Sequence, residues 1–227
     1  GFSIDKVAPY LATGPTLNKG PAYYKAGETV SVSFTTNEDL DLSLPVVTLN
    51  TTATLPMPCT AGADTNDYTC TMTRALLGTD LPQGQVSVSI SLKDAAQNTG
   101  FASVTVTLDN DNPTLLAATP SQASYRAGET LAYTVTVSEP LGGTGQPTVR
   151  IYKDGGIQAG FFGAPTGTDT SFTYTRTVAG GMDGTYTEET DLADKAGNAV
   201  ANTGTATGWK IDTVLPAIAA LGAAAAV

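Results

Sequence analysis

The chain of 227 residues contains no histidine, which removes a common source of enzyme chemistry. Ser-His-Asp and Cys-His nucleophiles and His-ligated zinc sites all need an imidazole. The neighbouring acids Asp39/Asp41 and Glu188/Glu189 come closest to a paired-carboxylate hydrolase, which needs two acids across a cleft. The first pair lies in a predicted loop, and the two glutamates are adjacent on a predicted strand and face opposite ways. We therefore expect both pairs to be solvated surface and the chain to have no enzymatic activity.

Basic residues are scarce as well. Eleven lysines and arginines stand against 21 acids, giving a net charge of -10 and an isoelectric point near 4.2. So acidic a chain is a poor partner for nucleic acid or an anionic membrane. No uncharged apolar run approaches the roughly eighteen residues of a membrane span. We expect neither nucleic acid nor a membrane span to be involved.

Cysteine is limited to two residues, Cys59 and Cys70, which flank a polar segment in the first half of the chain. This spacing would let them join neighbouring strands, and closing so short a loop stabilises a fold by about 3 kcal/mol. A disulfide would indicate an oxidising, extracytoplasmic location. The second half has no counterpart, so the predicted bridge is a local reinforcement. Two unrelated thiols remain the alternative.

What the chain does contain is an internal duplication. The segment YKAGETV returns as YRAGETL at an offset of 101, and DAAQN returns as DKAGN at an offset of 100. A linker that ends in proline, with an aspartate four residues before it, occurs three times, at residues 4–9, 108–113 and 211–216. A period near one hundred residues matches one small globular domain. The sequence therefore predicts a tandem array of homologous domains.

The linkers also set the predicted boundaries. We assign residues 1–5 to the end of a preceding repeat or its linker, 6–109 to the first domain and 110–212 to the second. Residues 213–227 resemble a linker and the first strand of a following repeat. We interpret the chain as two full repeats taken from a longer polypeptide.

Apolar and small polar residues alternate with a period of two, as in Leu131–Val137, which predicts strands with one face in a core. About seven such strands per hundred residues are typical of an immunoglobulin-like sandwich. The predicted fold class is therefore all-β, with two tandem immunoglobulin-like β-sandwich domains. The predicted strands are residues 10–16, 29–35, 46–50, 68–73, 86–93 and 101–108, then 114–118, 130–137, 148–153, 171–178, 185–192 and 203–211.

These motifs together resemble the bacterial immunoglobulin-like tandem repeats of large surface and secreted proteins, including adhesins. The second half carries Y-x-A-G-E before a strand, S-E-P-L after it, P-T-V-R-I, F-T-Y, D-K-A-G-N and I-D-x-x-x-P. The first half is looser, with Gln97 where glycine is usual. The resemblance implies the sandwich fold, a repeated architecture and an extracellular or cell-surface location, without pointing to one ligand.

Acidic residues are predicted to gather where the two repeats join. In this type of sandwich, alternate loops meet the linkers at the two ends of each domain, and carboxylates that converge there repel one another unless a cation lies among them. Ca²⁺, which takes six to eight oxygen ligands, fits such a set. The central linker also resembles the cadherin inter-domain calcium linker, one residue shorter. The predicted ligands are Glu28, Asp80, Asp109, Asp111, Glu139, Asp194 and Asn198.

The alternative is that these acids shape turns, because aspartate in D-x-A-G-N bonds nearby backbone amides. The outer linkers keep a single aspartate each, Asp5 and Asp212, so we expect weaker metal binding there or none. Two aromatic residues, Phe161 and Trp209, are candidates for an exposed platform that binds sugar rings, with core packing as the alternative.

The function predicted from these features is structural: a non-catalytic spacer in the stalk of an extracellular surface protein, whose partners are neighbouring repeats of the same polypeptide. One alternative is a filament subunit, in which a neighbouring molecule completes an exposed strand edge. Another is a carbohydrate-binding accessory module of a secreted enzyme, recognising a glycan or a surface receptor.

Overall fold

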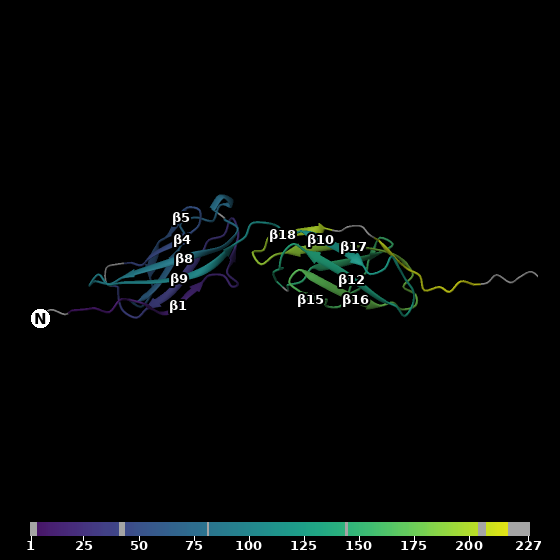
Figure 1. Ribbon diagram of the computed structural model, residues 1–227, viewed down its shortest axis with the longest axis horizontal. Helices are drawn as coiled ribbons and strands as arrows, with labels where there is room; N and C mark the ends of the chain where they lie inside the picture. The colour runs from purple at the N-terminus through teal and green to yellow at the C-terminus, as the bar shows by residue number, and fades with distance from the viewer. Residues whose placement is uncertain (1–3, 41–43, 81, 144, 204–207, 218–227) are drawn as a thin grey trace, which may run out of the picture. The chain divides into compact units, whose positions relative to one another are not determined.

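The computed structural model describes residues 4–40, 44–80, 82–143, 145–203 and 208–217 (Figure 1). The chain divides into two compact units, residues 1–112 with 195–198 and residues 113–194 with 199–227. The described part of each unit is built from strands, with one short 3-10 segment, η1 (Gly78–Asp80), in the first. None of the helical structure described is long and apolar enough to cross a membrane.

The first unit consists of two sheets that pack against a common core, and all their strand pairs are antiparallel except the parallel pair β2–β9. One sheet has the order β1-β3-β7-β6, and the other has the order β2-β9-β8-β4-β5. The strands of the first sheet are β1 (Leu11–Leu17), β3 (Ser31–Thr36), β7 (Asp67–Thr71) and β6 (Cys59–Ala61). Those of the second sheet are β2 (Tyr23–Tyr24), β9 (Thr99–Leu108), β8 (Gly84–Lys93), β4 (Val46–Asn50) and β5 (Thr54–Met57).

The second unit repeats this order, except that two strands, β18 and β19, take the place of the single strand β9. Its sheets are β10-β12-β16-β15 and β11-β19-β17-β13-β14, with β18 also paired to β17. The first contains β10 (Leu115–Pro120), β12 (Thr130–Val137), β16 (Ser171–Thr177) and β15 (Thr166–Thr168). The second contains β11 (Ser124–Tyr125), β19 (Trp209–Ile211), β17 (Gly184–Ala193), β13 (Thr148–Lys153), β14 (Gly156–Ile157) and β18 (Ala199–Thr203). Both units are immunoglobulin-like β-sandwiches, as predicted.

Alternation along the strands builds the two cores. On β12, Leu131, Tyr133, Val135 and Val137 are at most 1% exposed, while the residues between them are partly exposed. The same pattern on β3 buries Val32 and Phe34 in the first core. Each buried aliphatic side chain contributes about 1.5–3 kcal/mol through removal of apolar surface from water. The period of two therefore fixes which face of each sheet is covered.

The disulfide predicted between Cys59 and Cys70 is present. The two residues are directly opposite each other on β6 and β7, with their Cα atoms 3.9 Å apart. The bridge therefore joins neighbouring strands of one sheet and does not connect the two sheets. Both cysteines are buried, at 7% and 0% exposure, so the bridge also contributes to the first core.

After its first long strand the chain crosses from one sheet to the other, and the repeated Y-x-A-G-E motif forms the turn at the end of this crossing. In the first unit, Tyr24 on β2 pairs in parallel with Leu108 on β9 and is 1% exposed. Gly27 follows at φ +89°, a left-handed conformation in which side chains are unfavourable. The Glu28 carboxylate then accepts a hydrogen bond from the backbone N–H of Lys25 at 3.0 Å. The tyrosine, the glycine and the glutamate of the motif thus each have a structural role.

The second unit makes the same turn with the same atoms. Tyr125 pairs in parallel with Ile211, and Gly128 has φ +85°. The Glu129 carboxylate accepts from the backbone N–H of Arg126 at 2.9 Å. The glycine N–H in each unit also donates to a backbone carbonyl at 2.9 Å, that of Leu76 between β7 and β8 in the first unit and that of Val178 between β16 and β17 in the second. The motif therefore fastens one end of each sandwich.

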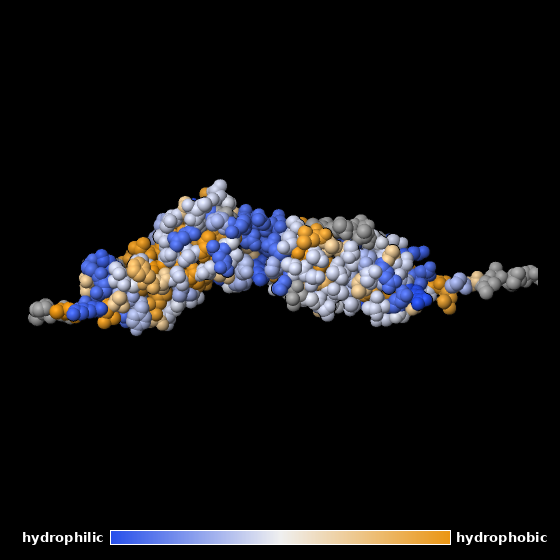
Figure 2. Space-filling view, in the orientation of Figure 1, coloured by the Kyte–Doolittle hydropathy of each residue, from blue (hydrophilic) through white to orange (hydrophobic). Residues whose placement is uncertain are grey.

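The surface differs between the two units. Figure 2 shows orange, hydrophobic patches among paler residues on the first unit. Its exposed apolar side chains include Val46 and Phe101, which are 65% and 78% exposed and lie in the same row of the second sheet, on either side of Ser91. On the corresponding face of the second unit, Arg150 bonds to Asp191 and Glu189. The repeats share a frame and differ in what they present to solvent.

Candidate metal site

The linker aspartates all form the same local turn. The carboxylate of Asp5 accepts from the N–H of Val7 at 2.9 Å, that of Asp109 from Asp111 at 3.2 Å, and that of Asp212 from Val214 at 3.2 Å. An aspartate that bonds the backbone two residues on is a common turn former. The recurrence of the linker motif therefore has a structural explanation in all three copies.

At the N-terminal end of the first unit, three acids come together. Carboxylate oxygens of Asp5, Glu38 and Asp94 all lie within 4.8 Å of one another. Asp5 belongs to the linker, Glu38 follows β3, and Asp94 follows β8. Asp5 is exposed, Glu38 is partly buried, and Asp94 is only 2% exposed. Three negative charges at this separation repel one another, most strongly where burial lowers the effective dielectric.

The geometry of Asp94 comes from the D-A-A-Q-N turn. Its two carboxylate oxygens accept from the backbone N–H and the side-chain amide of Asn98, both at 2.8 Å. Gln97 adopts φ +72° in this turn, at the position where the second repeat has Gly197 at φ +88°. The Asn98 amide also reaches the backbone carbonyl of Asp5 at 3.4 Å, which places the linker beside the turn. The turn thus holds a buried carboxylate facing two others.

The residues of this cluster fit a hard cation. Each carboxylate has about four lone-pair sites, so Asp94 keeps acceptor capacity beyond its two bonds to Asn98. Three carboxylates, nearby carbonyls and water can together supply the six to eight oxygens that Ca²⁺ takes. The chemistry of the donor set favours calcium over zinc, which prefers nitrogen and sulfur ligands.

The second unit contains two members of the same set. Glu139 and Asp194 are the counterparts of Glu38 and Asp94 at offsets of 101 and 100, and their carboxylate oxygens also lie within 4.8 Å of each other. Asp194 is 3% exposed and its backbone bridges to Leu141. Asn198, another predicted ligand, is 7% exposed. In sequence, the counterpart of Asp5 is Asp109, while Asp111 is an exposed linker residue.

Two of the predicted ligands are engaged by cations of their own domain. Glu28 accepts from the Lys19 ammonium at 2.8 and 2.9 Å, in addition to capping its turn. Asp80, at 7% exposure, accepts two hydrogen bonds from Arg74 and one from the N–H of Leu77. The Arg74 and Leu77 bonds lower the pKa of Asp80 to about 2. Both carboxylates thus stabilise the C-terminal end of the first domain without an ion.

Sequence reasoning missed Glu38 and Asp94 as partners of Asp5. The signal was available, because both occupy the repeat positions of Glu139 and Asp194, which were predicted as ligands. An aspartate alone in a linker was judged by its neighbours in sequence, whereas the loops after β3 and β8 supply the other carboxylates. The N-terminal linker therefore has more acidic neighbours than its sequence suggests.

The predicted exposed aromatic platform is wrong. Trp209 is 1% exposed and Phe161 is 7% exposed. Trp209 stacks on Tyr186 with ring centroids 5.8 Å apart, and Phe161 packs edge-on against Phe162 at 4.9 Å. Alternation along the final strand turns Trp209 inward, so its ring fills the second core.

The prediction for the adjacent glutamates is also wrong in one of its parts. Glu188 is 4% exposed, whereas Glu189 lies on the outer face and accepts from the Tyr152 hydroxyl at 2.8 Å. Asp39 is exposed, as expected, and Asp41 lies outside the described residues. The two glutamates do face opposite sides of the strand, as predicted, but the side that Glu188 faces is the core.

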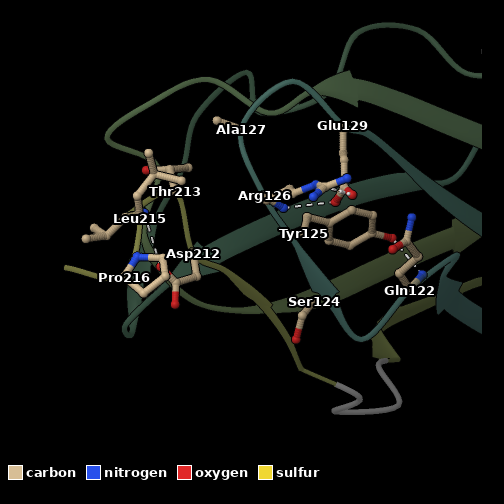
Figure 3. A pocket seen from close by; sticks show the side chains of 11 residues that line it. Gln122, Ser124, Tyr125, Arg126, Ala127, Glu129, Asp212, Thr213, Leu215 and Pro216 are labelled. Carbon is tan, nitrogen blue, oxygen red and sulfur yellow. Dashed lines mark hydrogen bonds and ion pairs between the residues drawn. The ribbon is translucent and has the colours of Figure 1, made fainter. Parts of the chain in front are cut away.

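A surface hollow of about 600 Å³ lies at the C-terminal end of the second unit (Figure 3). It is lined by the Y-R-A-G-E turn and by the linker from Asp212 to Pro216. Two of the charged side chains on its wall, Arg126 and Glu129, form an ion pair at 3.0 Å. The Tyr125 hydroxyl points away from them and accepts from the N–H of Gln122 at 2.8 Å. The hollow is therefore shaped by elements that hold the linker.

No protein-family model matches the chain, and no curated protein matches it. Among solved structures, a marsupial T cell receptor is 11% identical over 89% of this chain and 73% of its own length, with a TM-score of 0.50. The I-band fragment I67–I69 of titin is 15% identical over 92% of this chain, with a TM-score of 0.47, and the chain spans 66% of that fragment. Similarity at these identities concerns the immunoglobulin-like fold alone.

Replacing Asp80 tests whether this acid is structural. Asp80→Asn removes the ion pair with Arg74 and weakens the bond to the Leu77 N–H, so we expect the first domain to lose about 1–2 kcal/mol of unfolding free energy at pH 7. A carboxyl whose pKa is lowered on folding stabilises above its unfolded pKa of 3.8, and that stabilisation is lost as the pH falls to about 2. The difference between variant and wild type should therefore shrink in acid.

Urea unfolding followed by far-ultraviolet circular dichroism measures this loss. Asp64→Asn removes one exposed charge from the same domain and should leave its stability unchanged. If Asp80→Asn behaves like Asp64→Asn at pH 7, the structural role assigned to Asp80 is wrong.

Proposed function

We propose that the chain is a non-catalytic spacer segment of an extracellular bacterial surface protein, such as an adhesin stalk, in which successive repeats hold a distant functional domain away from the cell. The observation that carries this proposal is the position of the residues that the two repeats share. The residues shared between the two repeats form turns at the domain ends and the strand pairs that continue into the linkers.

The linkers are hydrogen-bonded to these turns. The N–H of Asp109 donates to the carbonyl of Tyr24 at 2.8 Å, and the N–H of Asp212 donates to that of Tyr125 at 2.9 Å. These bonds extend the parallel pairs β2–β9 and β11–β19. Ladder hydrogen bonds run across the strands, so tension along a linker loads several of them at once in shear. Such an arrangement suits a segment that transmits force.

The spacer function predicts that length adds up. Two or three copies of the chain joined through their natural linkers should show a maximum dimension that grows by a constant increment per copy in small-angle X-ray scattering. Immunoglobulin-like repeats behave as separate domains, so each copy should add its own length. A dimension that fails to increase from two copies to three would contradict the proposal.

Sedimentation of the single chain tests the alternative of a filament subunit. The filament function requires polymers that form through exposed strand edges and grow with protein concentration. A chain that stays monomeric at high concentration eliminates that alternative and leaves the spacer function unaffected.

We further propose that Ca²⁺ binds the cluster of Asp5, Glu38 and Asp94, and that the counterpart acids of the second repeat form the same kind of site. A cation would relieve the repulsion among these carboxylates and fix the linker to the loops after β3 and β8. The linker would then resist bending relative to its own domain. The contribution of the ion is therefore stiffness.

Glu38→Gln tests the calcium site. It removes one charged ligand while keeping the size of the side chain. The affinity of the first-domain site for Ca²⁺, measured by calorimetry, should therefore fall at least tenfold. Asp64→Asn, which removes an exposed acid elsewhere in the same domain, should bind as the wild type does. Equal Ca²⁺ binding by Glu38→Gln and the wild type, or no heat of Ca²⁺ binding to the wild type, would contradict the calcium site. Neither result would affect the proposed spacer function.

A further inference from the structure

The core of the second unit contains a carboxyl group. Glu188 lies on β17 in the same inward-facing row as Tyr186, Thr190 and Leu192, and is 4% exposed. Neither of its carboxyl oxygens has a hydrogen-bond partner among the residues that the structure describes. An ionised carboxylate in such surroundings is costly, and a buried acid avoids that cost by keeping its proton.

Other polar atoms lie in the same core. The Tyr133 hydroxyl on β12 and the Trp209 indole N–H on β19 are buried and make no hydrogen bond to any described residue. The rings of Tyr133 and Trp209 lie 5.5 Å apart, and the Tyr133 hydroxyl is near enough to Glu188 for the negative carboxylate to raise its pKa further, beyond the effect of burial. Three strands thus bring polar groups into the middle of one core.

The first unit has only aliphatic side chains at the matching positions. Strand register and the repeat offsets align the two cores residue by residue. The counterparts of Glu188, Tyr133 and Trp209 are Val88, Val32 and Val106, each of which is 0% exposed. Because three positions on three strands differ together, the polar core of the second repeat is a coherent feature and not one isolated substitution.

No cation among the described residues faces Glu188. On the neighbouring strand β13, Ile151 is opposite Glu188, while the guanidinium of Arg150 bonds to acids of the outer face. Arg176 on β16 donates to the carbonyl of Phe161, and Lys210 on β19 is exposed. Tyr133 is therefore the titratable group that faces Glu188.

Burial is the main effect on the Glu188 carboxyl group, and it raises the pKa of that group. The direction agrees with the geometry, because the carboxyl group is buried and no positive charge among the described residues compensates it. Protonated, the group becomes a hydrogen-bond donor and carries no charge into the core.

We propose that Glu188 is a proton-binding site of the second domain, which carries the proton when folded and is weakened when rising pH removes it. The sign follows from linkage, because the folded state binds the proton more tightly than the unfolded state. The stabilisation is therefore complete below the ordinary glutamate pKa of 4.5, which applies to the unfolded chain. It is lost as the pH rises from there through the pKa of the folded state. The second domain is thereby an acid-strengthened member of the pair.

Tryptophan fluorescence isolates this effect, because Trp209 is the only tryptophan of the chain and lies in the second core. In urea unfolding between pH 4.5 and pH 8, the wild-type midpoint should fall as the pH rises. Glu188→Gln keeps the shape and removes the charge, so it should flatten this dependence and raise the midpoint at pH 8. Asp169→Asn, which removes an exposed acid from the same domain, should keep the wild-type slope. A Glu188→Gln variant with the wild-type slope would overturn the proposal.

Carbon-13 NMR of the wild-type carboxyl groups provides a second test that needs no substitution. The Glu188 side-chain carbon should titrate with a midpoint above 4.5. Each unit by which this midpoint exceeds 4.5 corresponds to a tenfold change in the ratio of folded to unfolded second domain between low and high pH. A midpoint at or below 4.5 would show that the folded core holds the ionised form, and the proposal would be wrong.

Discussion

Each domain depends on the parallel pairing of a two-residue strand with the last strand of the sandwich. Tyr24 pairs with Leu108 in the first repeat, and Tyr125 pairs with Ile211 in the second. This pairing requires the chain to leave one sheet after its first long strand and join the other. Because the crossing strand contributes to both sheets, it fixes their relation and closes the core between them.

The same pairing explains why the repeats share the residues they share. The glycine and glutamate after the tyrosine shape the turn that releases the chain into the next strand, and the linker amide bonds back to the tyrosine carbonyl. Away from this frame the two domains are free to differ. The first is reinforced by the Cys59–Cys70 bridge, and the second has an aromatic core with a buried acid. The two repeats thus agree at the ends of the domain and differ in its middle.

Much of the fold could be predicted because alternation is a strong local signal. The strands at 46–50, 130–137 and 148–153 were placed at their observed bounds. The strands β2 and β11 were missed, since two residues are too few to show alternation, and only the partner strand reveals them. The short edge strands β14 and β15 were missed for the same reason.

The site was harder to predict than the fold, because a side chain's partner is a tertiary fact. Asp80 has Arg74 six positions away, and nothing in the sequence distinguishes that pair from two solvated charges. The position of Glu188 could have been read from the sequence, since it shares the parity of Tyr186 and Leu192 along the strand. The assumption that an acid must be solvated overrode that pattern, as it does wherever a core contains an unexpected polar group.

Single-molecule stretching of the chain through its two ends tests the central claim, that two separately folded domains bear force through their end strands. The account predicts two distinct unfolding events, one per domain. Reduction of the disulfide should lengthen one of them by about 35 Å, because the bridge shortens the path across a sequence separation of 11 residues and each extended residue adds up to about 3.6 Å. A single cooperative event for the whole chain, or extension without a force peak, would contradict it.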